Sequence, residues 1–81
     1  MKKSISNAIV NRINHYLGER NMSAYELAIK SNIPYPTIKS IMQKRTKSID
    51  LKNVILLAYG LNITPSEFIN DKSFNLENLN L

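Results

Sequence analysis

Two short helices joined by a tight turn are the feature that most constrains the fold of this 81-residue chain. Ser23 and Glu26 form the pattern of a capping box, in which a hydroxyl and a carboxylate each accept a backbone N–H at the start of a helix. The pattern predicts a helix over residues 23–31. Asn32 falls where this helix must end, because Asn tolerates the left-handed backbone conformation better than other residues except Gly. A helix of about two turns and a sharp change of direction are therefore expected.

The second of these helices begins at a pair of prolines, Pro34 and Pro36. A proline biases the residue before it away from the helical region, so neither Ile33 nor Tyr35 is expected to be helical. Pro36 is best placed as the first residue of a helix over about residues 36–44, where its missing N–H costs nothing. A link of three or four residues does not let the two helices run antiparallel, so they should cross at a steep angle.

The N-terminal segment has the clearest helical periodicity. Its apolar residues recur at steps of three and four and form one stripe: Ile5, Ala8, Ile9, Ile13, Tyr16 and Leu17. Ser4 or Ser6 can cap the start of this helix, and Asn21 can end it in the left-handed conformation. His15 lies off the stripe and is interpreted as a solvated surface residue.

Two more helices are predicted in the C-terminal half, the first of them capped by Asp50. Its expected buried face consists of Leu51, Val54, Leu57, Ala58 and Leu61. The run V-I-L-L-A-Y could also be a buried strand, but the long stripe, the cap and the lack of a partner strand favour a helix that Asn62 ends. Residues 64–67 form a second capping box with a proline at the first helical position, and they start a helix around Phe68 and Ile69. The chain is thus predicted to be all-α, with five helices and no sheet.

Composition and charge narrow the class of protein. With no cysteine and one histidine, neither a metal nor another cofactor is predicted, and no nucleophile–base pair or glycine-rich phosphate loop suggests an enzyme. No apolar run approaches the roughly 20 residues that span a bilayer, so no membrane contact is expected. A small secreted domain would more often carry disulfides, so the lack of cysteine indicates a cytoplasmic protein. The net charge of +5 is uneven: the chain through Lys47 is strongly basic and the remainder slightly acidic, which suggests a polyanion partner on one face.

The helix over residues 36–44 combines an apolar side with a basic, polar side. Ile38, Ile41 and Met42 are expected to face the core, which turns the polar positions between them toward solvent or a partner. A helix has the right width for the DNA major groove, and the free N–H groups that start the preceding helix can hold a phosphate. These features favour double-stranded DNA as the partner over the alternative of a plain helical bundle whose basic side is merely solvated.

The stretch from Met22 to Phe68 resembles the XRE-type helix-turn-helix family of phage repressors and Cro. The matching features are Glu26-Leu27-Ala28, the turn at Asn32, Ile38 and Ile41, the basic loop over residues 44–47, and LLAYGLNITPSEFI. The resemblance implies a compact, five-helix, lambda-repressor-like domain over residues 1–70, with the helix-turn-helix at its second and third helices. It also implies sequence-specific DNA binding, usually as a dimer. Residues 71–81 are then a C-terminal tail that forms a dimer contact, packs on the bundle or is disordered.

Several residues depart from the family pattern. Asn32 stands at the turn position that is usually Gly, and Lys44 stands where a Gly often follows the recognition helix. Ala24 replaces a Gln that holds a phosphate in many members. Leu17 and Met42 occupy the positions of a frequent Arg–Glu pair, which is consistent with exchanging an ion pair for apolar packing.

The resemblance and the charge pattern together select candidate DNA contacts. The candidate base-reading residues lie at the entrance and on the outward side of the recognition helix: Tyr35, Thr37, Lys39 and Ser40. The candidate phosphate contacts lie at the start of the preceding helix and around the end of the recognition helix: Ser23, Gln43, Lys44, Arg45 and Lys47. Tyr35 can donate a hydrogen bond or contact a thymine methyl group, whereas Pro36 offers only shape.

The sequence therefore predicts a transcriptional regulator, a phage- or mobile-element-type repressor that binds a palindromic operator as a homodimer. Leu56, Tyr59 or the tail after Asp71 are the expected dimer contacts, because exposed apolar groups need a cover. The alternative is an antitoxin or another protein-interaction module that keeps the helix-turn-helix as a scaffold. Such a module would bind its protein partner through the apolar residues of the tail: Phe74, Leu76, Leu79 and Leu81.

Overall fold

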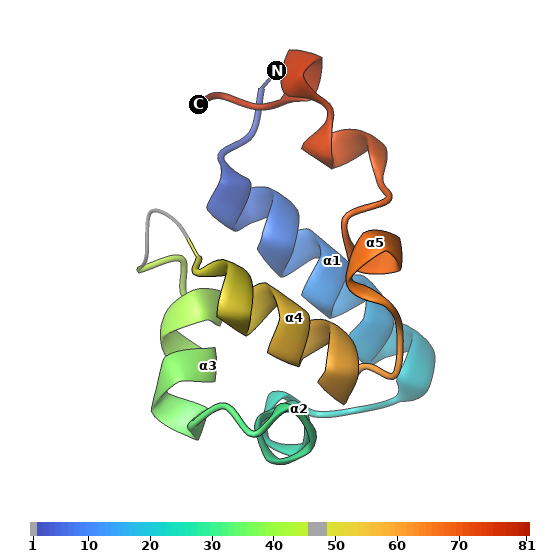
Figure 1. Ribbon diagram of the computed structural model, residues 1–81. Helices are drawn as coiled ribbons and strands as arrows, with labels where there is room; N and C mark the ends of the chain where they lie inside the picture. Colours follow the sequence, from blue (N-terminus) through green and yellow to red (C-terminus); the bar gives the residue numbers. More distant parts are fainter. Residues whose placement is uncertain (1, 46–48) are drawn as a thin grey trace.

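The computed structural model describes residues 2–45 and 49–81, and this part of the chain is helical (Figure 1). Its α-helices are α1 (Ile5–Arg20), α2 (Ala24–Ser31), α3 (Tyr35–Met42), α4 (Leu51–Gly60) and α5 (Pro65–Phe68). Two short 3-10 helices follow, η1 (Lys72–Phe74) and η2 (Leu76–Asn78). The prediction of an all-α fold with five α-helices is confirmed.

The ends of the helices follow from the local signals in the sequence. Ser4 and Thr64 each accept a hydrogen bond from the backbone N–H three residues further on. Ser23 and Glu26 form the complete capping box, with one bond of 3.1 Å and one of 3.2 Å. The residues that end α1, α2 and α4 in the left-handed conformation are Asn21 (φ 52°), Asn32 (φ 59°) and Asn62 (φ 60°). Short polar residues thus mark the starts of α1, α2 and α5 and the ends of α1, α2 and α4.

The bounds of α3 differ from the prediction at both ends. The helix begins at Tyr35 rather than Pro36, with Pro34 as its N-cap residue. The bias against helix before a proline is a preference, and the second helical position, where Pro36 lies, also has no intrahelical acceptor for an N–H. The helix ends at Met42, because Lys44 adopts a φ of 59°.

The predicted buried face of α4 is correct in its centre and wrong at its first turn. Leu57, Ala58 and Leu61 are buried, but Leu51 is 72% exposed. Leu56, which was expected off the stripe, packs partly against the core. Helical spacing alone does not determine which edge of an apolar stripe its neighbours cover. Asp50 occupies the N-cap position of α4, but its side chain makes no capping hydrogen bond there.

A close approach between α2 and α4 fixes that packing. A Cβ atom added to Gly60 would lie 2.8 Å from the Cβ of Ser31, closer than side chains tolerate. Ser31 is fully buried, and its hydroxyl donates to the carbonyl of Ala28. The core around this contact draws on α1 to α5 and consists mainly of Ile9, Ile13, Tyr16, Leu27, Ile33, Ile38, Ile41, Leu57, Leu61 and Phe68.

Arg12 of α1 holds the short helix α5 in place. Its Nε donates to the carbonyl of Phe68 over 2.7 Å, and its Nη2 donates to the carbonyl of Glu67 over 2.7 Å. Nη2 also donates to the hydroxyl of Tyr16, and Nη1 lies 3.8 Å from a carboxylate oxygen of Asp71. The last carbonyls of a helix lack partners within it, so this guanidinium caps the C-terminal end of α5.

The second predicted capping box is present in part. Thr64 accepts from the N–H of Glu67 over 3.1 Å, as expected. The carboxylate of Glu67 accepts instead from the hydroxyl of Tyr16 over 3.2 Å. Phe68 is buried, whereas Ile69, the second residue expected to anchor this helix, is half exposed. The side chain that was expected to complete a local motif therefore takes part in a tertiary contact with α1.

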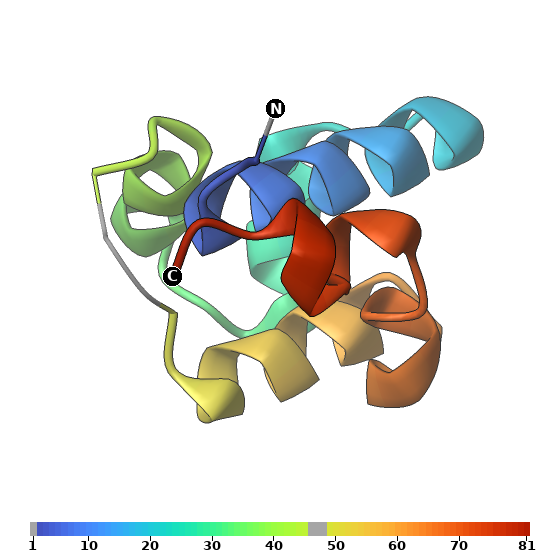
Figure 2. The same ribbon diagram turned by 90° about the horizontal axis from the view of Figure 1, so that it is seen from above.

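The segment after α5 folds back onto the N-terminal residues (Figures 1 and 2). The N–H of Lys3 donates to the carbonyl of Asn78, and the N–H of Asn80 donates to the carbonyl of Lys3. These bonds form an isolated parallel bridge between Lys3 and Leu79. Leu79 is buried, and Phe74 packs against the core. Within the described ranges, no helix has the length and apolar character needed to cross a membrane.

Candidate nucleic-acid interface

One side of α3 packs against the core, and the opposite side faces outward. Ile38 and Ile41 are buried, as predicted, and Met42 is partly buried. The candidate base-reading residues occupy the other side: Tyr35 and Lys39 are exposed, and Thr37 and Ser40 are partly buried. This distribution follows from the helical spacing of the three apolar residues. All four candidates are therefore on a face that a partner can approach.

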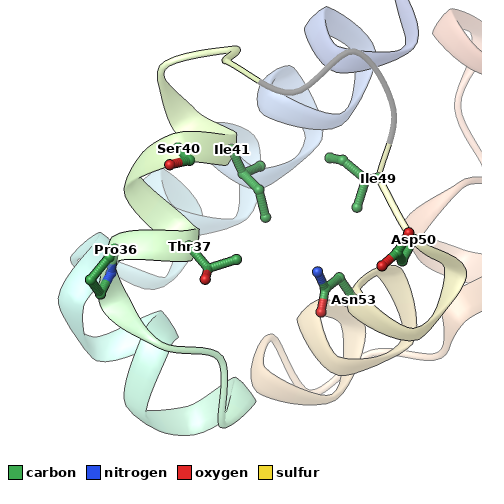
Figure 3. Close-up of a pocket in the computed structure, with 7 residues that line it drawn as sticks. All are labelled: Pro36, Thr37, Ser40, Ile41, Ile49, Asp50 and Asn53. Atoms are coloured by element: carbon green, nitrogen blue, oxygen red, sulfur yellow. The ribbon is translucent and has the colours of Figure 1, made fainter.

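A groove of about 460 Å³ separates α3 from the first turn of α4. Figure 3 shows Thr37 and Ser40 on its α3 side and Asn53 on its α4 side. Asp50 lines the same groove, with its carboxylate free of the capping bond expected from the sequence. The groove thus offers hydrogen-bonding groups from two helices to whatever enters it. Sequence reasoning missed Asn53, and its position directly after Lys52 gave no signal that sets it apart from other polar residues of the helix surface.

A second hollow, of about 310 Å³, brings base-reading and phosphate candidates together. Its lining residues are Tyr35, Pro36, Lys39, Ser40, Gln43 and Arg45. Two of these residues contribute a positive charge, and no Asp or Glu is among them. The outer side of α3 and the residues after it therefore form one continuous polar and basic surface, as a contact to DNA requires.

The end of α3 directs Lys44 and Arg45 away from the core. The N–H of Lys44 donates to the carbonyl of Ile41, and the N–H of Arg45 donates to the carbonyl of Ser40. This pattern is a Schellman motif in which Lys44 is the left-handed residue (φ 59°), a position where Gly is preferred. Lys44 and Arg45 are both exposed. The candidate Lys47 lies outside the described residues.

Ser23 has a local role that limits what it can offer a phosphate. Its hydroxyl oxygen accepts from the N–H of Glu26, and its own N–H donates to the carboxylate of Glu26. The hydroxyl hydrogen is then left to donate outward, together with the N–H groups of the first turn of α2. The carboxylate at the same helix end opposes a phosphate, so this is the weakest of the phosphate candidates.

The exposed cations of this surface differ from those on α1 in their partners. In residues 2–45 and 49–81, the close contacts between basic and acidic side chains are Arg12–Asp71, His15–Glu19 and Arg20–Glu19, all based on α1. No carboxylate in these ranges pairs with Lys39, Lys44 or Arg45. Their charges are available to an external anion without first breaking an internal pair.

Tyr25 is a residue of this surface that the sequence did not single out. It lies in the first turn of α2, is 58% exposed, and its ring contacts that of Tyr35 edge to face, with centroids 5.3 Å apart. Lys39 approaches the Tyr35 ring to 5.8 Å. The entrance of α3 thus carries two contacting aromatic rings, with Lys39 beside one of them.

The two residues of α4 that were expected to form dimer contacts differ in their exposure. Leu56 packs partly against the core, whereas Tyr59 is 76% exposed. Leu51 and Ile55 are also exposed and precede Tyr59 at four-residue steps, so the three form one apolar row along α4. The sequence missed Leu51 and Ile55 in this role because it placed Leu51 in the core.

Comparison with known proteins agrees with this geometry. Residues 12–73 match the family model of the Cro/C1-type HTH DNA-binding domain. The match includes all five α-helices in whole or in part and covers most of the chain. Comparisons with curated proteins and with solved structures returned no match.

Proposed function

Because the chain belongs to the Cro/C1-type helix-turn-helix family of DNA-binding domains, we propose that it is a repressor of the phage or mobile-element type. In this proposal the protein binds a palindromic operator as a homodimer. The observation that supports the proposal is the basic surface around α3. Five of the candidate contacts line one hollow there, and the described cations Lys39, Lys44 and Arg45 have no carboxylate partner in the part of the chain that the structure describes.

In the proposed complex, α3 enters the major groove. Thr37 and Ser40 present hydroxyl groups that can donate to or accept from base edges, and Lys39 can donate to a guanine. Gln43, Lys44 and Arg45 follow at the C-terminal end of the helix, where they contact phosphates and fix its position without selecting a sequence. Base contacts then discriminate between sequences, and phosphate contacts provide most of the salt dependence.

The homodimer is proposed from the apolar row on α4. A two-fold axis places the same surface of two subunits against itself, so a row with Ile55 at its centre can pack against its own copy, Leu51 against Tyr59. Exposed apolar side chains in a row favour such a cover. Two recognition helices about 34 Å apart then meet successive major grooves on one side of the duplex.

The test begins with selection of binding sites from random duplex DNA by the full chain. Titrations of the selected site and of a scrambled site at several salt concentrations then compare three variants. Ser40→Ala and Lys39→Ala should lower the ratio of specific to non-specific affinity, by about 1–3 kcal/mol at one base pair. Arg45→Ala should weaken binding to both DNAs alike and reduce the salt slope by about one unit.

Two results would contradict this assignment. If Ser40→Ala and Lys39→Ala both leave the ratio unchanged, α3 does not read the sequence. If sedimentation or mass measurements of the complex give one chain per DNA site, the proposed dimer is wrong. A Tyr59→Glu variant sharpens the second test, because a charge in the α4 row should weaken dimeric binding while leaving isolated subunits folded.

The alternative is an antitoxin or another protein-interaction module. Two apolar residues of the tail, Leu76 and Leu81, are more than 70% exposed and could contact a protein. Leu79 and Phe74 pack within the chain, so half of the apolar residues expected to form that contact are already in use. A chain that selects no DNA sequence but retains a protein partner through Leu76 would favour this alternative over the repressor.

A further inference from the structure

We propose that Tyr25 and Tyr35 together form an apolar recognition element for the 5-methyl group of a thymine, in which Tyr25 positions the ring of Tyr35. The proposal rests on DNA binding through α3. It extends the recognition surface from α3 to the first turn of α2 and names the chemical group that the entrance of α3 selects.

The first observation is the exposure of two large rings at one point of the surface. Tyr25 is 58% exposed and Tyr35 is 39% exposed, and they come from the first turns of α2 and α3. Two aromatic rings that contact each other yet stay open to solvent leave an apolar area uncovered in the free protein. Tyr35 lines a hollow with Lys39 and Ser40, so a DNA duplex bound along α3 would reach this edge of the apolar area.

The second observation is that the ring of Tyr35 is held by two neighbours. The ring of Tyr25 meets it at 78° with a centroid distance of 5.3 Å, an edge-to-face contact. The ammonium group of Lys39 lies 5.8 Å from the centroid of the same ring. A side chain fixed in this way contacts a ligand with little further loss of rotamer freedom.

The third observation concerns what the entrance of α3 can recognise. Pro34 and Pro36 flank Tyr35 and have no N–H to donate, so apart from the two tyrosine hydroxyls this corner has few hydrogen-bond donors and presents mainly ring surface. In the major groove, the base-pair feature that fits an apolar surface is the 5-methyl group of thymine. Tyr25 and Tyr35 are therefore suited to a T·A pair at one position of each half-site.

The experiment replaces single thymines by uracil in the DNA site selected by the wild-type chain. This exchange removes the methyl group and leaves the hydrogen-bonding edge of the base intact. We expect one thymine in each half-site at which the exchange weakens wild-type binding about fourfold, the value for one buried methyl group. Binding should be unaffected by the exchange at thymines that α3 does not reach.

Four variants connect this loss to the two rings. Tyr35→Ala should bind the thymine and uracil sites with equal affinity. Tyr25→Ala should reduce the fourfold preference for the thymine site to about twofold. Tyr35→Phe and Tyr25→Phe keep the rings and should retain the full fourfold difference. Ile69→Ala is the matched control, since Ile69 is an apolar residue that is 50% exposed and lines a hollow beside α5 with Ser66, Glu67 and Asn70, not one that Tyr25 or Tyr35 lines. It should leave the difference unchanged. Thermal unfolding of each variant establishes that it is folded.

The outcomes separate this inference from the proposed function. If the chain selects no DNA sequence, the proposed function fails and this inference fails with it. If a site is selected and Ser40→Ala relaxes its specificity, but no thymine-to-uracil exchange weakens binding, the inference alone is wrong. An equal thymine preference in Tyr35→Ala and the wild type would also overturn it. If Tyr25→Ala retained the full difference while Tyr35→Ala lost it, the positioning role of Tyr25 would be refuted.

Discussion

Arginine has opposite roles at the two ends of this small domain. Arg12, on α1, has a side chain that is 11% exposed and donates to two carbonyl groups and a tyrosine hydroxyl. Arg45, just after α3, is exposed and lines an open hollow with Lys39 and Gln43. The first guanidinium satisfies backbone groups that α5 leaves unpaired, whereas the second is available to an external partner.

The contrast extends to the surroundings of each arginine. Around Arg12, the polar groups of α1, α5 and the tail are bonded to one another, so this region contributes stability and little that a ligand could use. Around Arg45, the described cations have no carboxylate partner, a state that stabilises nothing in the free protein. A group of unpaired cations around α3 is the arrangement expected of a domain that binds a polyanion there.

The largest expected difference in stability is that between alanine variants of Arg12 and Arg45. Arg12→Ala should lower the free energy of unfolding by about 3 kcal/mol, because several bonds from a largely buried charged group are lost and the carbonyl of Phe68 is left without a donor. Arg45→Ala should change it by less than about 0.5 kcal/mol, as is usual for an exposed side chain. Urea unfolding measures the free energy of unfolding of both variants. In titrations with DNA at a temperature where both are folded, Arg45→Ala should lose more affinity than Arg12→Ala. Similar unfolding energies for the two variants would remove the contrast.

The two glycines sharpen the comparison in the backbone. A Cβ at Gly60 would lie 2.8 Å from Ser31, so Gly60→Ala should destabilise by about 1–3 kcal/mol through overpacking between α2 and α4. A Cβ at Gly18 meets no heavy atom within 4 Å. Gly18→Ala should therefore stabilise α1, by up to about 1 kcal/mol. Melting curves of both variants decide the point, and a stabilising Gly60→Ala would mean that the close approach of α2 to α4 is wrong.

The parts of the fold that sequence reasoning predicted are those with local causes. Ser23 with Glu26 starts α2, and Asn32 ends it, through bonds that span a few residues. The buried side of α3 follows likewise from the spacing of Ile38 and Ile41. Such signals can be found without knowing what the segment packs against, which is why the order of the five helices was predictable.

The parts that sequence reasoning missed depend on contacts between distant segments. Arg12 bonds to residues 55 and 56 positions away, and nothing in the spacing of α1 indicates this. The exposure of Leu51 depends on which side of α4 its neighbours cover. At the candidate interface, the contact of Tyr25 with Tyr35 depends on the angle between α2 and α3. The contacts of the candidate residues with DNA stay a prediction.

A smaller effect is expected at Lys44, where stability and binding should change in opposite directions. Lys44 has a φ of 59°, a conformation that costs a residue with a Cβ about 1 kcal/mol. Lys44→Gly should therefore stabilise the free protein by about 0.5–1 kcal/mol. The same change removes a candidate phosphate contact, so it should weaken binding to all DNA sequences and reduce the salt slope by about one unit. A variant that is more stable and binds with an unchanged salt slope would exclude Lys44 from the interface.

The smallest expected effect is the pH dependence of the contact between α1 and the tail. The hydroxyl and the N–H of Ser73 donate to the carboxylate of Asp71, and with the charge of Arg12 they hold the pKa of Asp71 below its ordinary value, although burial opposes them. A depressed pKa means that the contribution to stability is complete above the ordinary value of about 3.9 and is lost as the pH falls through the lower value of the folded state.

Asp71→Asn should therefore lower the melting temperature slightly at pH 6, and the difference from the wild type should disappear toward about pH 2. Melting curves between these limits measure the difference directly. Lys72→Ala is the matched control: it changes the neighbouring charge, but its side chain does not contact the Asp71 carboxylate, so its difference should not follow the titration of Asp71. A difference for Asp71→Asn that persisted at pH 2 would show that the carboxylate stabilises the tail by its shape rather than its charge. Asp71 would then no longer belong to the satisfied charges around Arg12.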